Sequence, residues 1–597
     1  MSPDDSPGPG DRGAGGGPEG PNLDAVELEI LRTQLEAVAE EMGEVLVRGA
    51  YSPNITERRD CSTALFDTDG QLVAQAEHIP VHLGAMPAAV DAVRDRDPDP
   101  GDVWILNDPF TGGTHLPDVT LVSPLTRPDD APGDDATDRT ANEADEIVGF
   151  AVSRAHHADV GGITPGSMPA GAREIHQEGL RIPPIRLVVA GEHRDEVEGL
   201  VLANVREPAA RRVDLRAQVA ANQRGEARVH DLLSRHGDRL LAAFPAVIDY
   251  ARERTRAAIA EIPDGTYTAE DALEGDGVTD DDVPVRVAVT VDGATLRVDF
   301  DGTAAQVDGN VNAPLSVTRS AVYYVIRCIT GADIPPNAGC YEPVTVTAPA
   351  GSFLNPDPPA AVVGGNVETS QRVADVVFAA LAEAAPERVP AGGQGTMNNL
   401  VVGSPDFAYY ETVGGGAGAS HDRDGGSGVQ VGMTNTRNTP IEALEAAYPL
   451  RVERYALRAD SGGPGRHDGG DGLVRSLRLE TDATVSILSD RRRHAPRGLA
   501  GGEDGQPGVN RIDGEIVGPK VTRDVPAGTV VTVETPGGGG FGEPAEAAGP
   551  PDLHAGSDGS HGDGGDDVVE APDERDGTAG ESGQASDAAD PTGGGDA

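Results

Sequence analysis

Two short His-x-x-Asp units carry the side chains of this sequence that are best suited to chemistry. The first runs from His115 to Asp118 and the second from His156 to Asp159. Two imidazoles and two carboxylates are enough ligands for a divalent metal, and nitrogen and oxygen ligands suit Mn, Fe, Zn or Co better than Ca or Cu(I). The same side chains could instead hydrogen-bond one another and cap loops. Their types and spacing leave both interpretations open.

Each unit lies near an apolar run that is typical of a buried strand. Val103–Leu106 precedes the first unit and Val148–Val152 precedes the second, and neither run alternates with polar residues. Double glycines at Gly112-Gly113 and Gly161-Gly162 indicate tight turns in the two loops. We therefore expect both loops to emerge from neighbouring positions in one core.

Other polar clusters have competing interpretations. Asp60, His78 and His82 either hydrogen-bond within the fold or form a second layer around a metal. The cluster from Arg491 to His494 either holds a carboxylate or phosphate group or pairs with the protein's own acids. The glycine clusters predict close backbone turns, because no G-x-x-x-x-G-K-[ST] phosphate loop is present and the sole lysine, Lys520, is not in one.

Composition limits the possible partners. The chain has 597 residues and a formal net charge of −52, with 99 acidic against 47 basic residues. An acidic surface with almost no lysine is typical of a protein dissolved in concentrated salt, where self-repulsion is screened over about 3 Å. The charge predicts a halophile's protein and argues against nucleic acid or an anionic membrane as partner. No apolar run is long enough to span a membrane, the 3 cysteines are too few for a disulfide framework, and we expect a cytoplasmic location.

The order of patterns along the chain predicts an α+β protein, a large mixed body with antiparallel hairpins and long helices. Asn22 or Asp24 could cap a helix that continues to about Val47, and Asp69-Gly70 and Asp292-Gly293 mark two hairpins. Residues 22–543 form the expected catalytic body, and 127–146 form an acidic surface insertion. The polar, glycine-rich segments 1–21 and 544–597 are expected to be disordered.

A series of motifs is spread along the chain from about Leu31 to Gly542. They include ERRDCSTALFD, HIPVHLGAMP, NDPFTGGTHLPDVTLVSP, RAHHADVGGITPGSMP, GNVNAPLSVTRSAVYYVIR, GGNVETSQRVADVV, QGTMNNL, YYETVGGGAGA, MTNTRNTPIEALE and RRRHAPRGL. In these motifs the sequence resembles the hydantoinase B/oxoprolinase family. That family includes the B-type subunit of ATP-dependent N-methylhydantoinase, the carboxy-terminal half of 5-oxoprolinase and the metal-bearing subunit of acetone carboxylase.

The resemblance implies a metal site and its ligands. In the acetone carboxylase branch two His and two Asp hold a Mn-type ion, which implies that His115, Asp118, His156 and Asp159 hold a divalent metal of Mn, Zn or Fe type here. His157 is either an alternative ligand or a member of the second layer.

The resemblance also implies a function. It suggests the B-type subunit of an ATP-dependent cyclic amide hydrolase, which opens a carbonyl-activated ring with a metal-bound water. Asp108 and His82 are then candidates for general base or substrate orienter, although loop capping explains Asp108 equally well. ATP and Mg would lie on a hydantoinase A-like partner subunit. The alternatives are a subunit of an acetone-carboxylase-like enzyme and a non-catalytic, partner-binding scaffold.

Overall fold

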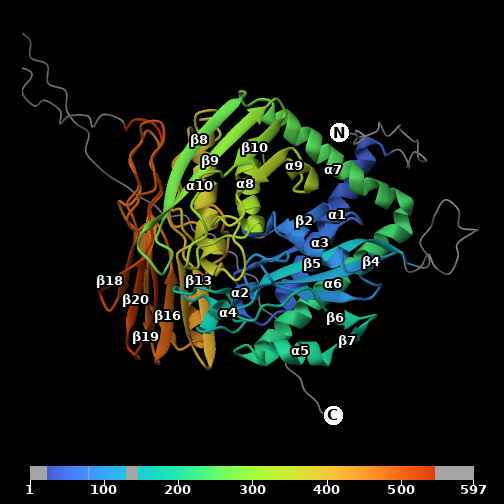
Figure 1. Ribbon diagram of the computed structural model, residues 1–597, viewed down its shortest axis with the longest axis horizontal. Coiled ribbons are helices and arrows are strands. Elements are labelled where there is room, and N and C mark those ends of the chain that lie inside the picture. The colour runs from blue at the N-terminus through green and yellow to red at the C-terminus, as the bar shows by residue number, and fades with distance from the viewer. Residues whose placement is uncertain (1–22, 78, 129–145, 332, 545–597) are drawn as a thin grey trace, which may run out of the picture. The chain divides into compact units, whose positions relative to one another are not determined.

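The computed structural model describes residues 23–77, 79–128, 146–331 and 333–544 (Figure 1). His78 and nearly all of the segments predicted as disordered ends and acidic insertion lie outside the described residues. The expectations for those segments therefore stay predictions.

Both apolar runs beside the His-x-x-Asp units belong to one seven-stranded sheet, with one strand between them, and they share one apolar core. The strand order is β2-β1-β5-β4-β3-β6-β7, and all neighbouring strands are antiparallel. Figure 1 shows β4 and β5 side by side. The strands are β1 (Cys61–Phe66), β2 (Leu72–Glu77), β3 (Val103–Leu106), β4 (Asp118–Thr126), β5 (Ile147–His156), β6 (Ile185–Val189) and β7 (Glu192–His193).

Helices pack on both faces of this sheet because its strands are apolar on both sides. Leu65 and its neighbours pack against three long helices, α1 (Ala25–Gly49), α6 (Pro208–His236) and α7 (Asp238–Ile259). Phe66, one residue further along β1, belongs to the opposite face and packs with helix α3 (Met86–Arg94). Successive side chains of a strand point to opposite faces, so a strand between two helical layers has no polar side.

Helix α1 forms as its sequence predicts. The carboxylate of Asp24 accepts hydrogen bonds from the backbone N–H groups of Val26 and Glu27, at 3.0 and 2.8 Å. Such a cap stabilises a helix by about 1 kcal/mol. Buried side chains recur every three or four residues, so the helix has one apolar face toward the sheet. They are Leu31, Leu35, Val38, Ala39, Met42, Gly43, Leu46 and Val47.

A four-stranded sheet of order β11-β10-β9-β8 packs against helices α8 (Leu315–Thr330) and α10 (Ser370–Leu381) in the largest core cluster. The predicted hairpin at Asp292-Gly293 joins β9 and β10, and Gly293 has a φ of 57°. β10 and β11 are parallel, whereas the other two pairs are antiparallel. The strands are β8 (Gly265–Glu274), β9 (Asp282–Asp292), β10 (Thr295–Asp299) and β11 (Val344–Thr347).

Two further antiparallel sheets share an apolar core, of orders β13-β12-β16-β19 and β14-β15-β20-β17-β18. Leu400 and Ile487 of the first sheet belong to the same cluster as Leu477 and Val531 of the second. The strands are β12 (Asn399–Ser404), β13 (Phe407–Thr412), β14 (Leu450–Arg458), β15 (Gly472–Leu479), β16 (Ala483–Leu488), β17 (Val509–Ile512), β18 (Glu515–Val517), β19 (Lys520–Val525) and β20 (Val530–Glu534).

The shorter helical elements complete the fold. They are α2 (Pro53–Thr56), η1 (Pro80–His82), η2 (Pro165–Ser167), α4 (Ile175–Glu178), α5 (Asp195–Leu202), α9 (Ala338–Tyr341), η3 (Gly365–Thr369) and α11 (Ile441–Ala447). The mixture of antiparallel sheets and helices confirms the predicted α+β class. Within the described ranges, the helices lack the length and apolar character needed to cross a lipid bilayer.

Candidate metal centre

The pairing of β4 with β5 brings the two His-x-x-Asp units together. Asp118 is the first residue of β4 and His156 is the last of β5, and the two are direct partners across the antiparallel strands. Partners of this kind have Cβ atoms about 4.5–5.5 Å apart. His115 lies in the loop that leads into β4. Strand register therefore places one aspartate and two histidines, drawn from both units, at one point.

Three side-chain atoms of these residues form a small triangle. Nε2 of His115 lies 3.2 Å from Nδ1 of His156 and 3.4 Å from Oδ1 of Asp118. The third side, from Nδ1 of His156 to Oδ1 of Asp118, is 3.2 Å. All three residues are buried and have at most 3% of their surface exposed.

The triangle fits a divalent metal. Ligand atoms that lie about 2.0–2.2 Å from a metal, at tetrahedral or octahedral angles, are roughly 3.0–3.5 Å from one another. The observed separations of 3.2, 3.4 and 3.2 Å fall in that range. A carboxylate accepts only, and a neutral imidazole has one nitrogen with a free electron pair. One cation in the middle would satisfy all three atoms.

The local electrostatics favour the protonation states that metal binding requires. Burial lowers the pKa of His115 to about 3, so its imidazole is neutral near pH 7 and keeps an electron pair for a metal. Burial acts to raise the pKa of Asp118, but the neighbouring histidines outweigh it and hold that pKa well below the usual value. Asp118 is thus an anion, and a neutral histidine and an anionic carboxylate are the forms that ligate metals.

A small cavity of about 20 Å³ adjoins the triangle. A space of this size holds one water molecule or one ion, because a water needs about 10–15 Å³. Its other lining residues come from six separate parts of the chain: Asp60; Ile79, Val81 and His82; Asn366 and Val367; Met397; Tyr410 and Thr412; and Thr434 and Thr436. A ring-shaped substrate does not fit unless part of this lining moves.

His82 supports the triangle from a second layer. Its Nδ1 lies 2.9 Å from the hydroxyl oxygen of Ser62, and its Nε2 lies 3.5 Å from Oδ2 of Asp118. The hydroxyl of Thr114 donates a hydrogen bond of 2.6 Å to the same oxygen. The oxygen of Asp118 outside the triangle is therefore held in place. This geometry favours the second-layer interpretation of His82.

Tyr410 closes the cavity from β13. Its ring stacks on that of His156, with centroids 4.7 Å apart and an interplanar angle of 14°. Its hydroxyl donates to Oδ1 of Asn399 at 3.0 Å, and the guanidinium of Arg58 lies over its ring at 5.0 Å. Burial raises the pKa of Tyr410 far above its usual value, so the hydroxyl is neutral. The stacked ring of Tyr410 thus fixes the orientation of the His156 imidazole.

The structure does not bring Asp159 to the triangle, although the sequence pattern predicts it as the fourth ligand. Its Oδ1 accepts hydrogen bonds from the backbone N–H groups of Gly161 and Arg206, and its Oδ2 accepts from Gly166 N–H and from Nη1 of Arg206, all at 2.9 Å. Both oxygens are thus used by a loop and by one arginine. Loop capping therefore accounts for both oxygens of Asp159, and its role as a fourth ligand stays a prediction.

Two other candidates also lie outside the triangle. Nε2 of His157 is 2.9 Å from Oε1 of Gln218 on helix α6, so His156 and not its neighbour faces Asp118. Asp108 accepts from the backbone N–H of Phe110 at 3.1 Å and does not line the cavity. This contact favours the loop-capping interpretation of Asp108, and its catalytic role stays a prediction.

The Hydantoinase B/oxoprolinase profile matches residues 24–544. The chain belongs to the hydantoinase B/oxoprolinase family. It is 41% identical over 555 residues to 5-oxoprolinase 1 of Arabidopsis thaliana, an alignment that covers 87% of this chain and 42% of that protein. It is 33% identical to the B-type subunit of a putative D-/L-hydantoinase from a Pseudomonas species, covering 88% and 91%. The chain thus spans about two fifths of the 5-oxoprolinase and nearly all of the hydantoinase subunit.

Two solved structures share the fold. The ATP-dependent caprolactamase of Pseudomonas jessenii superposes with a TM-score of 0.78 at 30% identity, covering 87% of this chain and 91% of that one. A nucleotide-free acetone carboxylase superposes with a TM-score of 0.75 at 19% identity, covering 87% and 75%. At that identity the second match shows the fold alone.

Sequence reasoning missed the residues that close the cavity. Asn366, Met397, Tyr410 and Thr436 lie in the family motifs GGNVETSQ, QGTMNNL, YYETVGGG and MTNTRNT. The motifs could have identified these residues as candidates, because each motif places polar residues among apolar ones. Their convergence depends on how β12 and β13 pack near β5, which no local pattern encodes.

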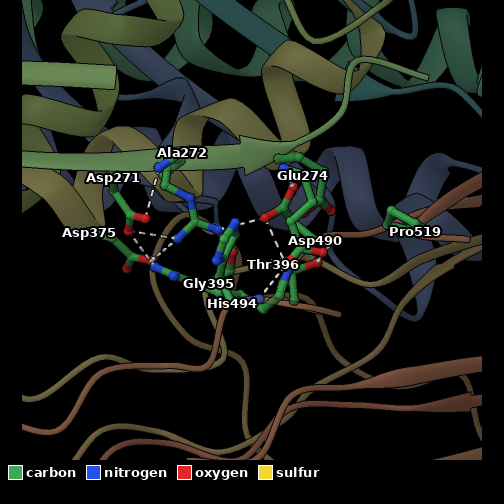
Figure 2. Close-up of polar contacts among 12 residues, drawn as sticks. Asp271, Ala272, Glu274, Asp375, Gly395, Thr396, Asp490, His494 and Pro519 are labelled. Carbon is green, nitrogen blue, oxygen red and sulfur yellow. Dashed lines mark hydrogen bonds and ion pairs between the residues drawn. The ribbon is translucent and has the colours of Figure 1, made fainter. Parts of the chain in front are cut away.

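The arginine cluster near residue 491 pairs with the protein's own acids, one of the two alternatives left open by the sequence. Figure 2 shows Asp271 and Asp375 side by side, with dashed lines running to guanidinium nitrogens. Arg491 contacts both carboxylates at 2.8 Å. The backbone N–H groups of Arg492 and His494 donate to Glu274 at 2.8 and 2.7 Å.

The glycine clusters pack the backbone of one segment closely against that of another, whereas the sequence analysis predicted turns. A Cβ added to Gly416 would lie 2.0 Å from the carbonyl oxygen of Gly470, and one added to Gly538 would lie 1.9 Å from that of Ala417.

Proposed function

We propose that this chain is the metal-bearing, ring-opening part of an ATP-dependent cyclic amide hydrolase of N-methylhydantoinase or 5-oxoprolinase type. The observation that carries the proposal is the buried triangle of His115, Asp118 and His156, whose atoms lie 3.2–3.4 Å apart. The relatives named as a 5-oxoprolinase and as a putative hydantoinase subunit support the substrate class. The structural match to a caprolactamase supports it as well.

The chain's own residues would act in defined ways. His115, Asp118 and His156 would hold a divalent ion of Mn, Zn or Fe type. When bound, such an ion polarises a carbonyl or phosphoryl oxygen and lowers the pKa of water toward about 7. His82 would hold a proton at its Nε2, which lies 3.5 Å from Asp118, while Ser62, 2.9 Å from its Nδ1, would keep the ring in place.

ATP would supply the driving force on another polypeptide or segment. Phosphorylation of the carbonyl oxygen makes the ring carbon electrophilic, so one water adds to it and the ring C–N bond breaks, with the nitrogen taking a proton, to give an acyl phosphate. A second water hydrolyses the acyl phosphate and releases phosphate. The products are the open-chain amino acid or N-carbamoyl acid, ADP and phosphate. The chain has no G-x-x-x-x-G-K-[ST] loop, and one relative is named as a single subunit of a hydantoinase. We therefore propose a hydantoinase A-like partner that binds ATP and Mg.

The test combines this chain with a hydantoinase A-like partner, ATP, Mg²⁺ and either 5-oxoproline or N-methylhydantoin, in molar salt. We expect ADP and ring-opened product in equal amounts, and no turnover with either polypeptide alone. ADP formation that requires acetone and bicarbonate would assign the chain to a carboxylase instead. No ATP turnover with any of these substrates, despite a stable complex, would favour a scaffold.

A metal-depleted sample gives a second readout. We expect turnover to disappear after chelation and to return with one added divalent ion per chain. Full turnover in the chelated protein would show that the reaction needs no metal at the triangle. The family assignment would not change.

A further inference from the structure

The cavity at the metal centre is too small for any ligand larger than water or an ion. Its volume is about 20 Å³, whereas small-molecule sites usually have about 300–1,000 Å³. A larger molecule can therefore reach the triangle only if part of the wall moves. Much of the wall is fixed in the core: Tyr410 and Thr412 belong to β13, Asn366 and Val367 belong to η3, and every residue of both elements is buried.

The segment 434–438, which we call the strap, is a thin part of this wall. Its residues alternate between the cavity and the solvent. Thr434 and Thr436 are buried and line the cavity, whereas Asn435 and Arg437 are exposed. A single layer of chain thus separates the cavity from the solvent at this place.

Few hydrogen bonds hold the strap. Within the described chain, residues 430–440 form no helix, strand or bridge, and Gly432 has a left-handed φ of 70°. Among the described residues, a single backbone–backbone hydrogen bond involves the strap, from the N–H of Arg437 to the carbonyl oxygen of Arg58 at 3.1 Å. Segments with few such bonds and exposed backbone open locally at low cost in free energy.

Arg58 holds the inner side of the strap. Its Nη2 donates to the hydroxyl oxygens of Thr412 at 2.7 Å and of Thr436 at 3.1 Å, and those two oxygens are 2.5 Å apart. On the outer side, the amide of Asn438 donates to the hydroxyl of Tyr455. The buried guanidinium of Arg58 thus joins the strap to β13, and side-chain hydrogen bonds do most of the work of holding it.

Both ends of the strap are anchored, as a movable segment between fixed points requires. Met433, directly before it, is fully buried in the largest core cluster, and its N–H donates to Oε1 of Gln371 at 3.3 Å. Helix α11 begins at Ile441, three residues after the strap, and Leu444 of that helix is buried in the core between the two C-terminal sheets. Movement of the strap therefore need not disturb either core.

We propose that the strap is the gate of the metal centre. Residues 434–438 move outward between their two anchors when the hydrogen bonds to Arg58 break. Thr434 and Thr436 leave the wall with them, so the space in front of the triangle grows and a molecule larger than water can enter. That the entering molecule is the activated ring rests on the proposed function, whereas the opening of the strap does not.

The first test measures how fast the centre exchanges its metal. The full chain is loaded with Mn²⁺ or Zn²⁺ in molar salt and mixed with excess EDTA. Thr436→Val keeps the shape of the side chain but removes the hydroxyl that contacts Arg58, and one hydrogen bond to a charged group is worth about a tenfold change or more in an equilibrium. We expect metal release and metal capture both to become about tenfold faster, with the Kd changed less than about twofold. Unchanged rates in a folded Thr436→Val protein would overturn the proposal, as would a tenfold change in Kd.

Thr318→Val on helix α8 is the matched control. It also removes a buried hydroxyl, one that donates to the carbonyl oxygen of Leu354 at 2.9 Å, and Thr318 does not line the metal cavity. We expect metal exchange at the wild-type rate in this variant, although its free energy of unfolding should fall. Equally fast exchange in both variants would mean that overall stability, and not the strap, sets the rate, and would overturn the proposal.

Hydrogen exchange follows the strap without metal, ATP or partner. The amide of Arg437 is the reporter, because its bond to the carbonyl oxygen of Arg58 must break before the amide exchanges. We expect this amide to exchange about tenfold faster in Thr436→Val than in the wild type, with the amides of β13 unchanged in both and no effect of Thr318→Val. An Arg437 amide that exchanges as slowly as those of β13 in the wild type would show that the strap does not open.

These measurements separate the strap from the proposed function. The expected response of the strap, together with no ATP-dependent turnover in the complex, would reject only the proposed function. Full turnover together with a strap that does not respond to Thr436→Val would reject only the strap as gate.

Discussion

The two His-x-x-Asp units have the same residue types at the same spacing, yet their aspartates lie in different surroundings. Asp118 begins β4 and faces two histidines at 3.2 and 3.4 Å. Asp159 lies three residues beyond the end of β5, and four N–H donors from a loop and from Arg206 occupy its carboxylate. The first is a metal-ligand candidate and the second holds a loop together.

The difference shows that position relative to a strand end, and not the motif, selects a ligand. In the antiparallel pair β4–β5 the start of one strand faces the end of the other. The residues at that junction are Asp118 and His156, one from each unit. The aspartate of the second unit has already left the sheet. The first unit thus contributes its histidine and its aspartate to the triangle, whereas the second contributes only its histidine.

The strongest test of this comparison replaces either His156, the last residue of β5, or His157, which follows it. We expect His156→Ala to lose its bound divalent ion, with affinity reduced by more than the roughly 10–100-fold seen when only a supporting group is removed. His157→Asn, the adjacent control, should keep the ion because His157 contacts Gln218. Elemental analysis and titration with Mn²⁺ or Zn²⁺ measure both, and equal metal in the two variants would break the comparison.

The second unit should respond in stability and not in metal content. Asp159→Ala leaves Arg206 and two glycine N–H groups without their acceptor, and the loss of a buried ion-pair partner costs about 3 kcal/mol. We expect a lower free energy of unfolding in denaturant titrations and unchanged metal stoichiometry. Loss of the metal in a folded Asp159→Ala protein would restore Asp159 as a ligand.

His82 and Asp108 give a smaller contrast of the same kind. His82→Gln removes the imidazole that lies 3.5 Å from Asp118, and we expect a loss of roughly 10–100-fold in metal affinity or turnover. Asp108→Asn, which keeps a side chain able to cap the loop, should change turnover less than about twofold. A large effect of Asp108→Asn in a normally folded enzyme would return Asp108 to the list of catalytic candidates.

His115 of the first unit should also make the stability of the metal-free protein depend on pH. The pKa of His115 is lowered from its ordinary value of 6.5 to about 3 in the fold. Between these values the unfolded chain binds a proton that the folded chain does not, so stability falls as pH decreases from about 6.5 toward 3, by at most about 1.4 kcal/mol per pH unit. Urea titrations at several pH values give the free energy of unfolding. Over this range it should fall more steeply with decreasing pH in the metal-free wild type than in His115→Gln. Parallel curves would show that burial does not perturb His115.

Local signals predicted much of the fold. Asp24, one of the two candidate helix caps, and the hairpins at Asp69-Gly70 and Asp292-Gly293 follow from short-range patterns and are confirmed. The order of the strands within the four sheets depends on contacts between distant segments, so short-range patterns could not predict it.

The candidate site was only partly predictable for the same reason. His115, Asp118 and His156 were among the predicted ligands, but the choice between His156 and His157 depends on which face of β5 each occupies. That face is set by register with β4. The halophilic character, the hydantoinase A-like partner and the cytoplasmic location stay predictions, because they concern conditions and molecules beyond a single chain.

The stacking of Tyr410 on His156 has a consequence in time. The three atoms of the triangle belong to residues 115–156, whereas the ring that covers them is synthesised roughly 250 residues later. Ribosomes add about 5–20 residues per second, so the cover follows the ligands by about 10–50 s. During that interval the nascent chain presents its imidazoles and carboxylate without their aromatic cover. The order of synthesis therefore leaves a window in which an ion from the surrounding solution can be captured before the site is closed.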